Sequence, residues 1–451
     1  MKKNKTEQIK QEDEVKINGS MVKKNLVLPL SLFLAGTLQG ADRPPVTYPR
    51  ATCGDNAIRV NWEEHLTVTV GPKDADIVGA NQKAIQAAVD YVARLGGGTV
   101  KILPGSYRLR NAVYLQSNVR LLGSGAATIL IKEPSVITKL SADSDWYDQE
   151  ITLADAQGFE VGDGVWLRAK KETGGGETVV KRTLIARSGN RFMLDKGLRD
   201  NFWQRNEATA STLFPLISGE LVNDVVIENL VLDGNRGQNE RMDGNYAGCI
   251  FLLDCNRITM RNVVARNHNG DGMSWQVCHD VVVENCTSEN NATLGLHAGS
   301  GSQRTIMRGN TVRGNDVGIF FCWGVKYGLA EGNLVEGNRI GISIGHRDTD
   351  NLIFGNKIIG SKDNGILFRT EREPGYSGHR NRIERNQLIN NGEEVAIDIQ
   401  GGPESLKFIK NEITDTRGKA KLTAVRIGPD AKDIELKDNK ISGFTTKVEK
   451  K

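Results

Sequence analysis

A repeat of 23 residues is the feature of this sequence that most limits its fold. A fixed period of this size over many copies is typical of a solenoid. Each copy is too short for two helices, and its apolar residues alternate with polar ones, as from Ile340 to Ile344. The repeat therefore predicts a coil of short strands that stack about 4.8 Å apart. Glycines at intervals of 23 or 24 residues mark the copies: Gly248, Gly272, Gly295, Gly318, Gly341 and Gly365.

Stacking places equivalent side chains of successive coils in columns. Two apolar columns that follow the repeat glycine are predicted to fill the interior: Met273, Leu296, Ile319, Ile342, Ile366 and Ile397, then Trp275, Ala298, Phe321, Ile344, Phe368 and Ile399. Stacked amides can satisfy one another as they do in cross-β structure. A column of asparagines is therefore predicted to form an internal ladder at one corner: Asn229, Asn262, Asn285, Asn310, Asn333, Asn356, Asn386 and Asn411.

A helix is predicted ahead of the repeats, in the segment AIQAAVDYVARLGGGTVKILPGSYRL. Its apolar residues follow helical spacing from Ala84 to Leu95, and Gly96 to Gly98 end the helix. Together with the repeats, this segment resembles the right-handed parallel β-helix superfamily of pectate lyases, polygalacturonases and alginate epimerases, over roughly residues 75–445. The resemblance implies an all-β, right-handed parallel β-helix solenoid. The helix is expected to cap the first coil, because an open end exposes core and unpaired strand edges.

The period breaks between Asp148 and Leu198, where short alternating strands are separated by Gly, Asp and Asn. This pattern predicts a small inserted β-subdomain. The expected parts are a leader, 1–40, a lead-in, 41–75, the capping helix and first coils, 76–134, the insert, 135–220, the β-helix coils, 221–445, and a tail, 446–451.

Residues 21–40 have the pattern of a secretory signal peptide: two lysines, an apolar run from Leu26 to Ala35, and small residues up to Gly40. Met21 is a candidate for the true start. The run is too short to span a bilayer comfortably. We therefore expect export to the periplasm or beyond, with no stable membrane insertion after cleavage.

Charge and cysteine content limit the partners and the redox chemistry. The net charge of +4 includes a lysine-rich leader, so no basic field for nucleic acid is visible. Cys255 and Cys278 are 23 residues apart and should stack in neighbouring coils. Either a disulfide or a pair of buried thiols would suit an exported protein.

Candidate functional residues lie on and beside the outward face of the strand after the repeat glycine. Long loops before Gly248 and after Phe368 flank four coils, a floor of about 15–20 Å that suits a short oligosaccharide. The alternative is a solvated β-face whose charges pair locally. The candidates are Asp271, Gln276, His297, Asp316, Phe320, Trp323, Arg339, His346, Arg347 and Arg369.

The stretch NGDG from Asn269 to Gly272 is similar to the Asn-x-Asp-Gly signature of polygalacturonases. This resemblance implies that Asp271 is a catalytic carboxylate. Hydrolysis needs two carboxylates that flank the bond, and Asp316, two coils or roughly 10 Å away, is the available partner. The second aspartate and the Gly-His-Gly of that family are absent, as are the pectate lyase and epimerase motifs.

A β-eliminating lyase needs a base for the proton beside a uronic carboxyl and positive charge to neutralise that carboxylate. Either His346 or His297 is a candidate base. The candidate carboxylate-binding groups are Arg347, Arg369 and Arg339. Sugar rings could stack on Trp323 and Phe320, with Gln276 beside them. The sequence identifies no cofactor with certainty, and Ca²⁺ held by Asp243, Asp271 and Asp316 is a further alternative.

The sequence therefore favours a secreted polysaccharide lyase or related uronan-modifying enzyme that acts on an acidic polysaccharide or oligosaccharide. Two alternatives stay open. One is a polygalacturonase-like glycoside hydrolase on the same fold. The other is a non-catalytic surface or adhesive β-helix that binds carbohydrate.

Overall fold

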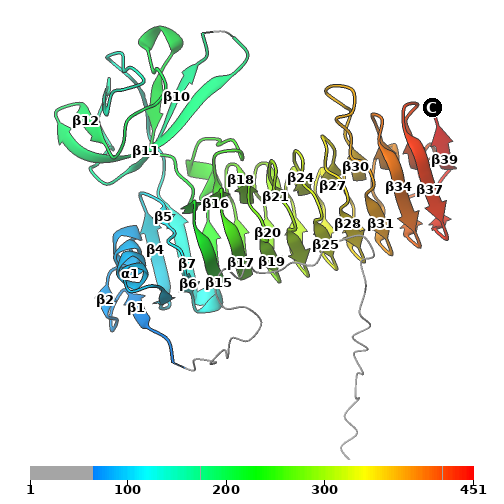
Figure 1. Ribbon diagram of the computed structural model, residues 1–451, viewed down its shortest axis with the longest axis horizontal. Coiled ribbons are helices and arrows are strands. Elements are labelled where there is room, and N and C mark those ends of the chain that lie inside the picture. The colour runs from blue at the N-terminus through cyan, green and yellow to red at the C-terminus, as the bar shows by residue number, and fades with distance from the viewer. Residues whose placement is uncertain (1–63, 173, 419) are drawn as a thin grey trace, which may run out of the picture. The chain divides into compact units, whose positions relative to one another are not determined.

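The computed structural model describes residues 64–172, 174–418 and 420–451. Within them the chain is nearly all β-structure and forms a right-handed parallel β-helix, as predicted (Figure 1). The predicted signal peptide, 21–40, and Cys53 lie outside the described residues. In the part of the chain that the structure describes, no helix is long and apolar enough to cross a membrane.

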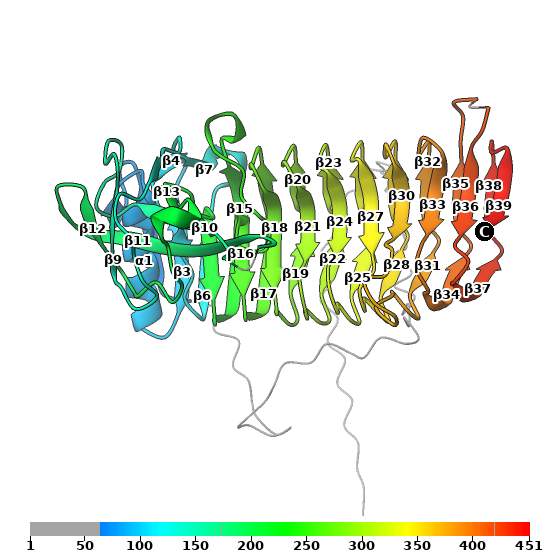
Figure 2. The same ribbon diagram turned by 90° about the horizontal axis from the view of Figure 1, so that it is seen from above.

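Each central coil contains three short strands, for example β22 (Ile306–Arg308), β23 (Thr311–Arg313) and β24 (Val317–Phe321). Equivalent strands of successive coils pair in parallel, so that Ile319 of β24 lies beside Ile342 of β27 (Ile340–Ile344). Figure 2 shows this side-by-side order from β16 to β39. The sequence period of 23 residues is thus one turn of the coil.

The first strands of successive coils stack in one row, and the second strands stack in another. The long strands β15 and β17 pair with both rows, so the two rows form one 22-stranded sheet. Its other strands follow in chain order: β1 (Thr67–Gly71), β2 (Ile77–Val78), β3 (Gly98–Ile102), β4 (Gly105–Leu109), β6 (Val119–Leu122), β7 (Thr128–Lys132), β15 (Asn223–Asp233), β17 (Asn256–Arg266), β19 (Val282–Glu284), β20 (Thr287–Glu289), β25 (Leu329–Glu331), β26 (Leu334–Glu336), β28 (Leu352–Phe354), β29 (Lys357–Ile359), β31 (Arg382–Glu384), β32 (Gln387–Ile389), β34 (Glu404–Ile409), β35 (Glu412–Thr414), β37 (Lys432–Lys437) and β38 (Lys440–Ser442).

The third strand of each coil belongs to an 11-stranded parallel sheet, which also contains β24 and β27. Its remaining strands are β5 (Val113–Tyr114), β14 (Ile217–Glu220), β16 (Gly248–Leu253), β18 (Asp271–Gln276), β21 (Leu294–Ala298), β30 (Asn364–Phe368), β33 (Val395–Ile399), β36 (Thr423–Ile427) and β39 (Thr446–Lys450). Residues 446–450 were expected to be a tail, and this was wrong, because β39 completes a coil by pairing with β36.

Both predicted apolar columns lie in the interior, where every one of their twelve side chains is at most 1% exposed. They belong to one continuous core that runs through the coils. Each buried side chain of this size contributes roughly 1.5–3 kcal/mol relative to an exposed one. The core columns are therefore a main source of stability.

The predicted asparagine column is right for its last five members and wrong for its first three. Asn333 Nδ2 donates to Asn356 Oδ1 at 2.8 Å and to the Met307 carbonyl at 2.9 Å, and the buried ladder continues to Asn439. The first three asparagines lie one residue earlier, at a left-handed turn with φ between 52° and 57°: Asn229, Asn262 and Asn285. Asparagine suits both positions, so spacing could not separate them. The interior places beside the three are taken by Leu230, Val263 and Cys286.

The predicted capping helix is α1 (Gln82–Arg94). Asn81 is its N-cap, and the Asn81 side chain accepts a hydrogen bond from the Ala84 N–H at 3.2 Å. Its apolar face, including Ile85 and Val89, is buried in the main core. The helix therefore closes the first coil, and Gly96 to Gly98 follow it with positive φ.

The inserted subdomain is an antiparallel six-stranded sheet with a core of its own. It spans 137–211 and is narrower than the predicted 135–220, because β14 belongs to the 11-stranded sheet. Its strands are β8 (Ile137–Lys139), β9 (Glu150–Thr152), β10 (Gly164–Lys170), β11 (Glu177–Ser188), β12 (Arg191–Leu194) and β13 (Thr209–Ser211).

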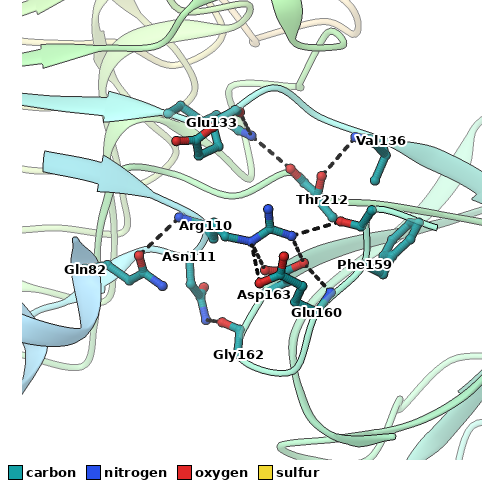
Figure 3. Close-up of polar contacts among 12 residues, drawn as sticks. Gln82, Arg110, Asn111, Glu133, Val136, Phe159, Glu160, Gly162, Asp163 and Thr212 are labelled. Atoms are coloured by element: carbon teal, nitrogen blue, oxygen red, sulfur yellow. Dashed lines mark hydrogen bonds and ion pairs between the residues drawn. The ribbon is translucent and has the colours of Figure 1, made fainter. Parts of the chain in front are cut away.

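Polar contacts fix the insert to the first coils (Figure 3). The Arg110 guanidinium binds both carboxylate oxygens of Asp163, at 2.7 and 2.8 Å. Lys132 is fully buried, and its Nζ donates to the Thr212 carbonyl at 2.8 Å. Burial lowers the pKa of Lys132 to about 7. These contacts hold the two ends of the insert in place.

Cys255 and Cys278 stack in neighbouring coils as predicted. Both are buried free thiols, and the Cys255 N–H lies 3.4 Å from Cys278 Sγ. Of the two alternatives that the sequence left open, the structure therefore has the buried thiols.

We expect Ile342→Ala to lower the free energy of unfolding by about 2–5 kcal/mol, because it opens a cavity in the first core column. Leu334→Ala is the matched control, since Leu334 points outward from β26 and is half-buried. Chemical denaturation should show a clearly larger loss for Ile342→Ala. Equal losses would contradict the interior position of Ile342.

Candidate functional site

One row of outward side chains follows the whole 11-stranded sheet, and we call it the outer row. Its members lie side by side in register: Tyr114, Ser218, Phe251, Ser274, His297, Phe320, Ser343, Leu367, Asp398, Arg426 and Glu449. The row includes the floor that the sequence predicted. Most of the candidate residues lie on or beside its middle part, in three groups.

The first group is a buried ion pair between Asp271 and His297. His297 Nδ1 lies 2.7 Å from Asp271 Oδ2, and the two residues are 2% and 0% exposed. Asp271 Oδ1 also accepts from the Leu294 N–H at 3.0 Å and from the Thr293 hydroxyl. Burial acts to lower the pKa of His297, but its hydrogen bonds to Asp271 and Cys322 outweigh burial and raise it to about 9. The imidazole is therefore a cation at neutral pH.

The loop before β16 closes over this pair. The Ser274 hydroxyl donates to the Gly244 carbonyl at 2.8 Å. A Cβ atom at Gly244 would lie only 1.9 Å from Asp271 Oδ2, so backbone covers the carboxylate directly. Gln276 lies flat over Gly299 and accepts from the Ser300 N–H at 2.8 Å. The predicted catalytic carboxylate is thus closed off from substrate.

The second group is Arg369 and the residues beneath it. Its guanidinium lies 4.3 Å above the Phe320 ring and donates to Ser343 Oγ at 2.9 Å. It also pairs with the fully buried Asp348 at 3.1 Å. Burial raises the pKa of Asp348 to about 7, against the opposing effect of Arg369. Arg369 therefore covers one face of Phe320, the ring that the sequence predicted as a sugar platform.

The third group, which we call the corner cluster, consists of Trp323, His346, Arg347, Arg372 and Tyr376. The Trp323 ring centroid lies 5.4 Å from that of His346 and 5.7 Å from that of Tyr376. The guanidinium carbon of Arg347 is 3.7 Å from the Tyr376 ring, and that of Arg372 is 5.2 Å from the Trp323 ring. Arg347 and Arg372 are exposed and the other three are half-buried. The cluster is therefore cationic, aromatic and open to solvent.

The backbone of the corner cluster is strained. His346 and Arg347 have φ angles of 45° and 68°, in the left-handed region that glycine favours. The two preceding coils place Gly301 and Gly324 at the position of Arg347, with φ of 69° and 72°. Non-glycine residues in this region cost of order 1–3 kcal/mol each and often mark functional sites.

His346 differs from His297 in its charge. Burial, followed by the nearby charges of Arg369 and Arg372, lowers the pKa of His346. Its Nδ1 is buried and has no hydrogen-bond partner among the described residues. The imidazole is therefore neutral near pH 7, which is the form that can accept a proton.

Arg339 and Asp316 lie apart from these three groups, in an exposed ion-pair cluster. Arg339 donates to Asp316 Oδ2 at 3.0 Å and to Asp363 Oδ2 at 2.7 Å. Asp316 is thus held by Arg339, while Asp271 is closed beneath Gly244. The structure does not present these two carboxylates as a facing pair.

The described residues contain no group of three or more His, Cys, Asp and Glu side chains that could hold a metal ion. Of the three residues in the Ca²⁺ alternative, Asp243 accepts from the Asn245 N–H at 2.8 Å, and the other two have the partners given above.

Sequence reasoning missed Arg372 and Tyr376 of the corner cluster, although the long loop after Phe368 was a signal for them.

A family profile described as periplasmic copper-binding protein (NosD) matches residues 199–414. Imidazole and thiolate are the ligands that copper favours, but His297 is engaged by Asp271 and the described residues offer no cluster of three ligands. They do not fit a copper centre. A comparison with curated protein sequences gives no match.

Solved structures with similar folds include two modules of mannuronan C-5 epimerases from Azotobacter vinelandii. The AlgE6 A-module is 17% identical, with a TM-score of 0.52, and the match covers 82% of this chain and 91% of that one. The AlgE4 A-module is 15% identical, with a TM-score of 0.51 and coverage of 85% and 99%. PfbA, a surface adhesin of Streptococcus pneumoniae, is 13% identical, with a TM-score of 0.51 and coverage of 84% and 93%. At these identities the similarity shows the fold.

We expect the buried ion pair to make stability depend on pH. The pKa of His297 is raised from 6.5 to about 9 in the folded chain. Its stabilising effect, on the order of 3 kcal/mol, is fully present below pH 6.5 and is lost as pH rises through 9. Denaturation at several pH values should show this loss in the wild type and a smaller loss in His297→Gln. Equal pH dependence would contradict the charged pair.

We expect Arg347→Gly to raise the free energy of unfolding by about 1 kcal/mol, because glycine relieves the left-handed strain. Arg313→Gly, in strand β23, is the matched control and should instead lower stability by roughly 0.5–1 kcal/mol. Thermal unfolding of both variants is the measurement. A loss of stability in Arg347→Gly would show that the position is not strained.

Proposed function

Because the chain is a right-handed parallel β-helix whose repeats resemble those of pectate lyases and alginate epimerases, we propose that it modifies an acidic polysaccharide by removing the proton beside a uronic carboxyl. The corner cluster carries this proposal. It combines a neutral imidazole, His346, with two exposed guanidinium groups, Arg347 and Arg372, and two aromatic rings, Trp323 and Tyr376. These groups meet the needs of a uronan-modifying site.

The proposed reaction begins with the uronate carboxylate bound by Arg347 or Arg372, which stabilises the charge that develops when the neighbouring proton leaves. His346 takes this proton from C5 and becomes an imidazolium. In elimination the electron pair forms the C4–C5 double bond, the bond to the oxygen on C4 breaks, and the imidazolium returns its proton to that oxygen. In epimerisation water instead donates a proton to C5 from the opposite face, and the imidazolium returns its own proton to the hydroxide that this leaves.

The sugar rings would stack on Trp323 and Tyr376, whose faces supply apolar contact. The strain at His346 and Arg347 supports a functional role, because the fold alone would favour glycine at the position of Arg347.

Export is part of the proposal. It is supported by the signal-like segment 21–40 and by the periplasmic description of the matching profile.

A second candidate function is carbohydrate binding without chemistry. The observation that favours it is the burial of the outer row. Three of the side chains that form the predicted floor, Ser274, His297 and Ser343, are at most 2% exposed. A surface adhesin is among the similar folds. The hydrolase alternative has less support, because Asp271 is closed beneath Gly244 and Asp316 is paired with Arg339.

A panel of polymers separates these functions. Polygalacturonate, mannuronan and a neutral dextran would be incubated with the full chain. Absorbance from unsaturated uronates indicates elimination, and deuterium uptake at C5 in heavy water without that absorbance indicates epimerisation. New reducing ends without either signal would indicate hydrolysis and overturn the proposal. Binding without any reaction would favour the second candidate.

We expect His346→Gln to lower turnover about 10²–10⁴-fold while binding persists, because it removes only the base. Trp323→Ala should weaken binding about tenfold through loss of one stacking platform, roughly 1.4 kcal/mol. Arg308→Gln is the control, since Arg308 pairs with Glu331 on the 22-stranded sheet. Steady-state kinetics and calorimetry on the polymer found by the panel measure both effects. Unchanged turnover in His346→Gln would remove this residue from the mechanism.

A further inference from the structure

A cleft of about 160 Å³ separates the inserted subdomain from the first coils. Two members of the outer row, Tyr114 and Ser218, line it from the sheet side, so the cleft lies at the first end of that row. The Gln86 side chain of α1 binds the Tyr114 backbone at 2.7 and 3.0 Å. Its other charged and aromatic lining residues are Lys181, Arg182, Asp195, Lys196, Phe214 and Glu220.

The Lys181 ammonium in this cleft has an ion-pair partner, Glu220, but no hydrogen-bond acceptor in the described part of the chain. Its Nζ is buried, lies 3.8 Å from the centroid of the Phe251 ring, and has no hydrogen-bond acceptor among the described residues. The nearest carboxylate oxygen, Glu220 Oε1, is 3.6 Å away, beyond hydrogen-bond reach. Burial lowers the pKa of Lys181 to about 8. An anionic oxygen of a ligand would satisfy this group, because buried charges without hydrogen bonds are costly.

Two other charges beside Lys181, those of Arg182 and Asp195, are already engaged. Arg182 donates to the carbonyls of Lys196 and Leu198 at 3.1 and 2.7 Å. Asp195 Oδ1 accepts from the Thr183 N–H at 2.8 Å. Lys181, which pairs with Glu220 at 3.6 Å, is therefore a buried charge that still lacks a hydrogen bond within the residues described.

The cleft is held in shape before any ligand arrives. Arg110 binds Asp163 of the insert, and Asn111 donates to the Gly162 carbonyl at 3.2 Å (Figure 3). Asn111 also donates to Thr183 Oγ1, two residues from Lys181, at 3.0 Å. A site fixed by such contacts loses little entropy when a ligand binds.

We propose that this cleft binds a single uronic acid residue, with the sugar carboxylate on Lys181 Nζ. Its volume is below the roughly 300–1,000 Å³ of sites for larger ligands, which suits one sugar ring. The rings of Tyr114 and Phe214 supply apolar contact for that ring. The choice of a uronate rests on the proposed function, while the anion site rests on Lys181. The cleft would take either a free uronate or the end residue of a uronan.

Calorimetry on the full chain tests this site with D-galacturonate, D-glucuronate, a short oligogalacturonate and D-glucose. We expect a uronate to bind and glucose not to bind. Lys181→Met should weaken uronate binding at least tenfold, whereas Lys139→Met, an exposed lysine of the insert, should not change it. Tighter binding of the oligomer than of the free sugar, lost in Lys181→Met, identifies a chain end, and equal binding identifies the free sugar.

No uronate binding by the wild type would overturn the site, as would unchanged binding in Lys181→Met with thermal unfolding like that of the wild type. His346→Gln separates this site from the corner cluster, because it should lower turnover about 10²–10⁴-fold and leave binding of the free uronate to the cleft unchanged. If no polymer is modified but the uronate binds through Lys181, the proposed function fails and the cleft stands.

Discussion

Parallel stacking of coils at a fixed register is the constraint on which the rest of this structure depends. Each strand of the coils pairs with its equivalent one turn away, so each interior side chain must fit those above and below it. The amide ladder obeys the same constraint with polar side chains. The buried Asn333 side chain donates hydrogen bonds to the Asn356 side chain one coil away and to a backbone carbonyl. Interior positions are therefore fixed by the repeat, and function is left to the outward face, the corners and the insertions.

This division explains how much of the fold the sequence could predict. The core columns and the capping helix follow from periodicity, and the structure confirms them. The ladder was wrong for its first three members because Asn262 and Asn310 lie in adjacent columns that both accept asparagine, one for its left-handed backbone and one for its amide. The last strand was missed because Val448 is the only aliphatic residue among 446–451, so no alternation was visible. It forms because β36 offers a free edge.

The candidate site could be predicted only in its composition. Residues one coil apart, such as Asp271 and His297, had to be close, and they are paired. Their burial could not be predicted, because it comes from the path of the loop that holds Gly244, which no period fixes. The same holds for Tyr376, which reaches Trp323 from the other loop, and for Lys181, which the insert places over Phe251.

Departures from the repeat are therefore the most informative positions in this chain, but they do not all indicate function. His268 stands in the interior column that Asn291 and Asn315 continue, and the Asn291 side chain accepts from its backbone N–H. Both of its ring nitrogens are buried without partners in the described chain, and burial lowers the pKa of His268 to about 4. His297 is equally buried but keeps its charge, because Asp271 faces it. Charge at each departure is set by the partner and not by burial alone: no carboxylate of the described residues faces the half-buried His346, and burial together with the charges of Arg369 and Arg372 lowers its pKa.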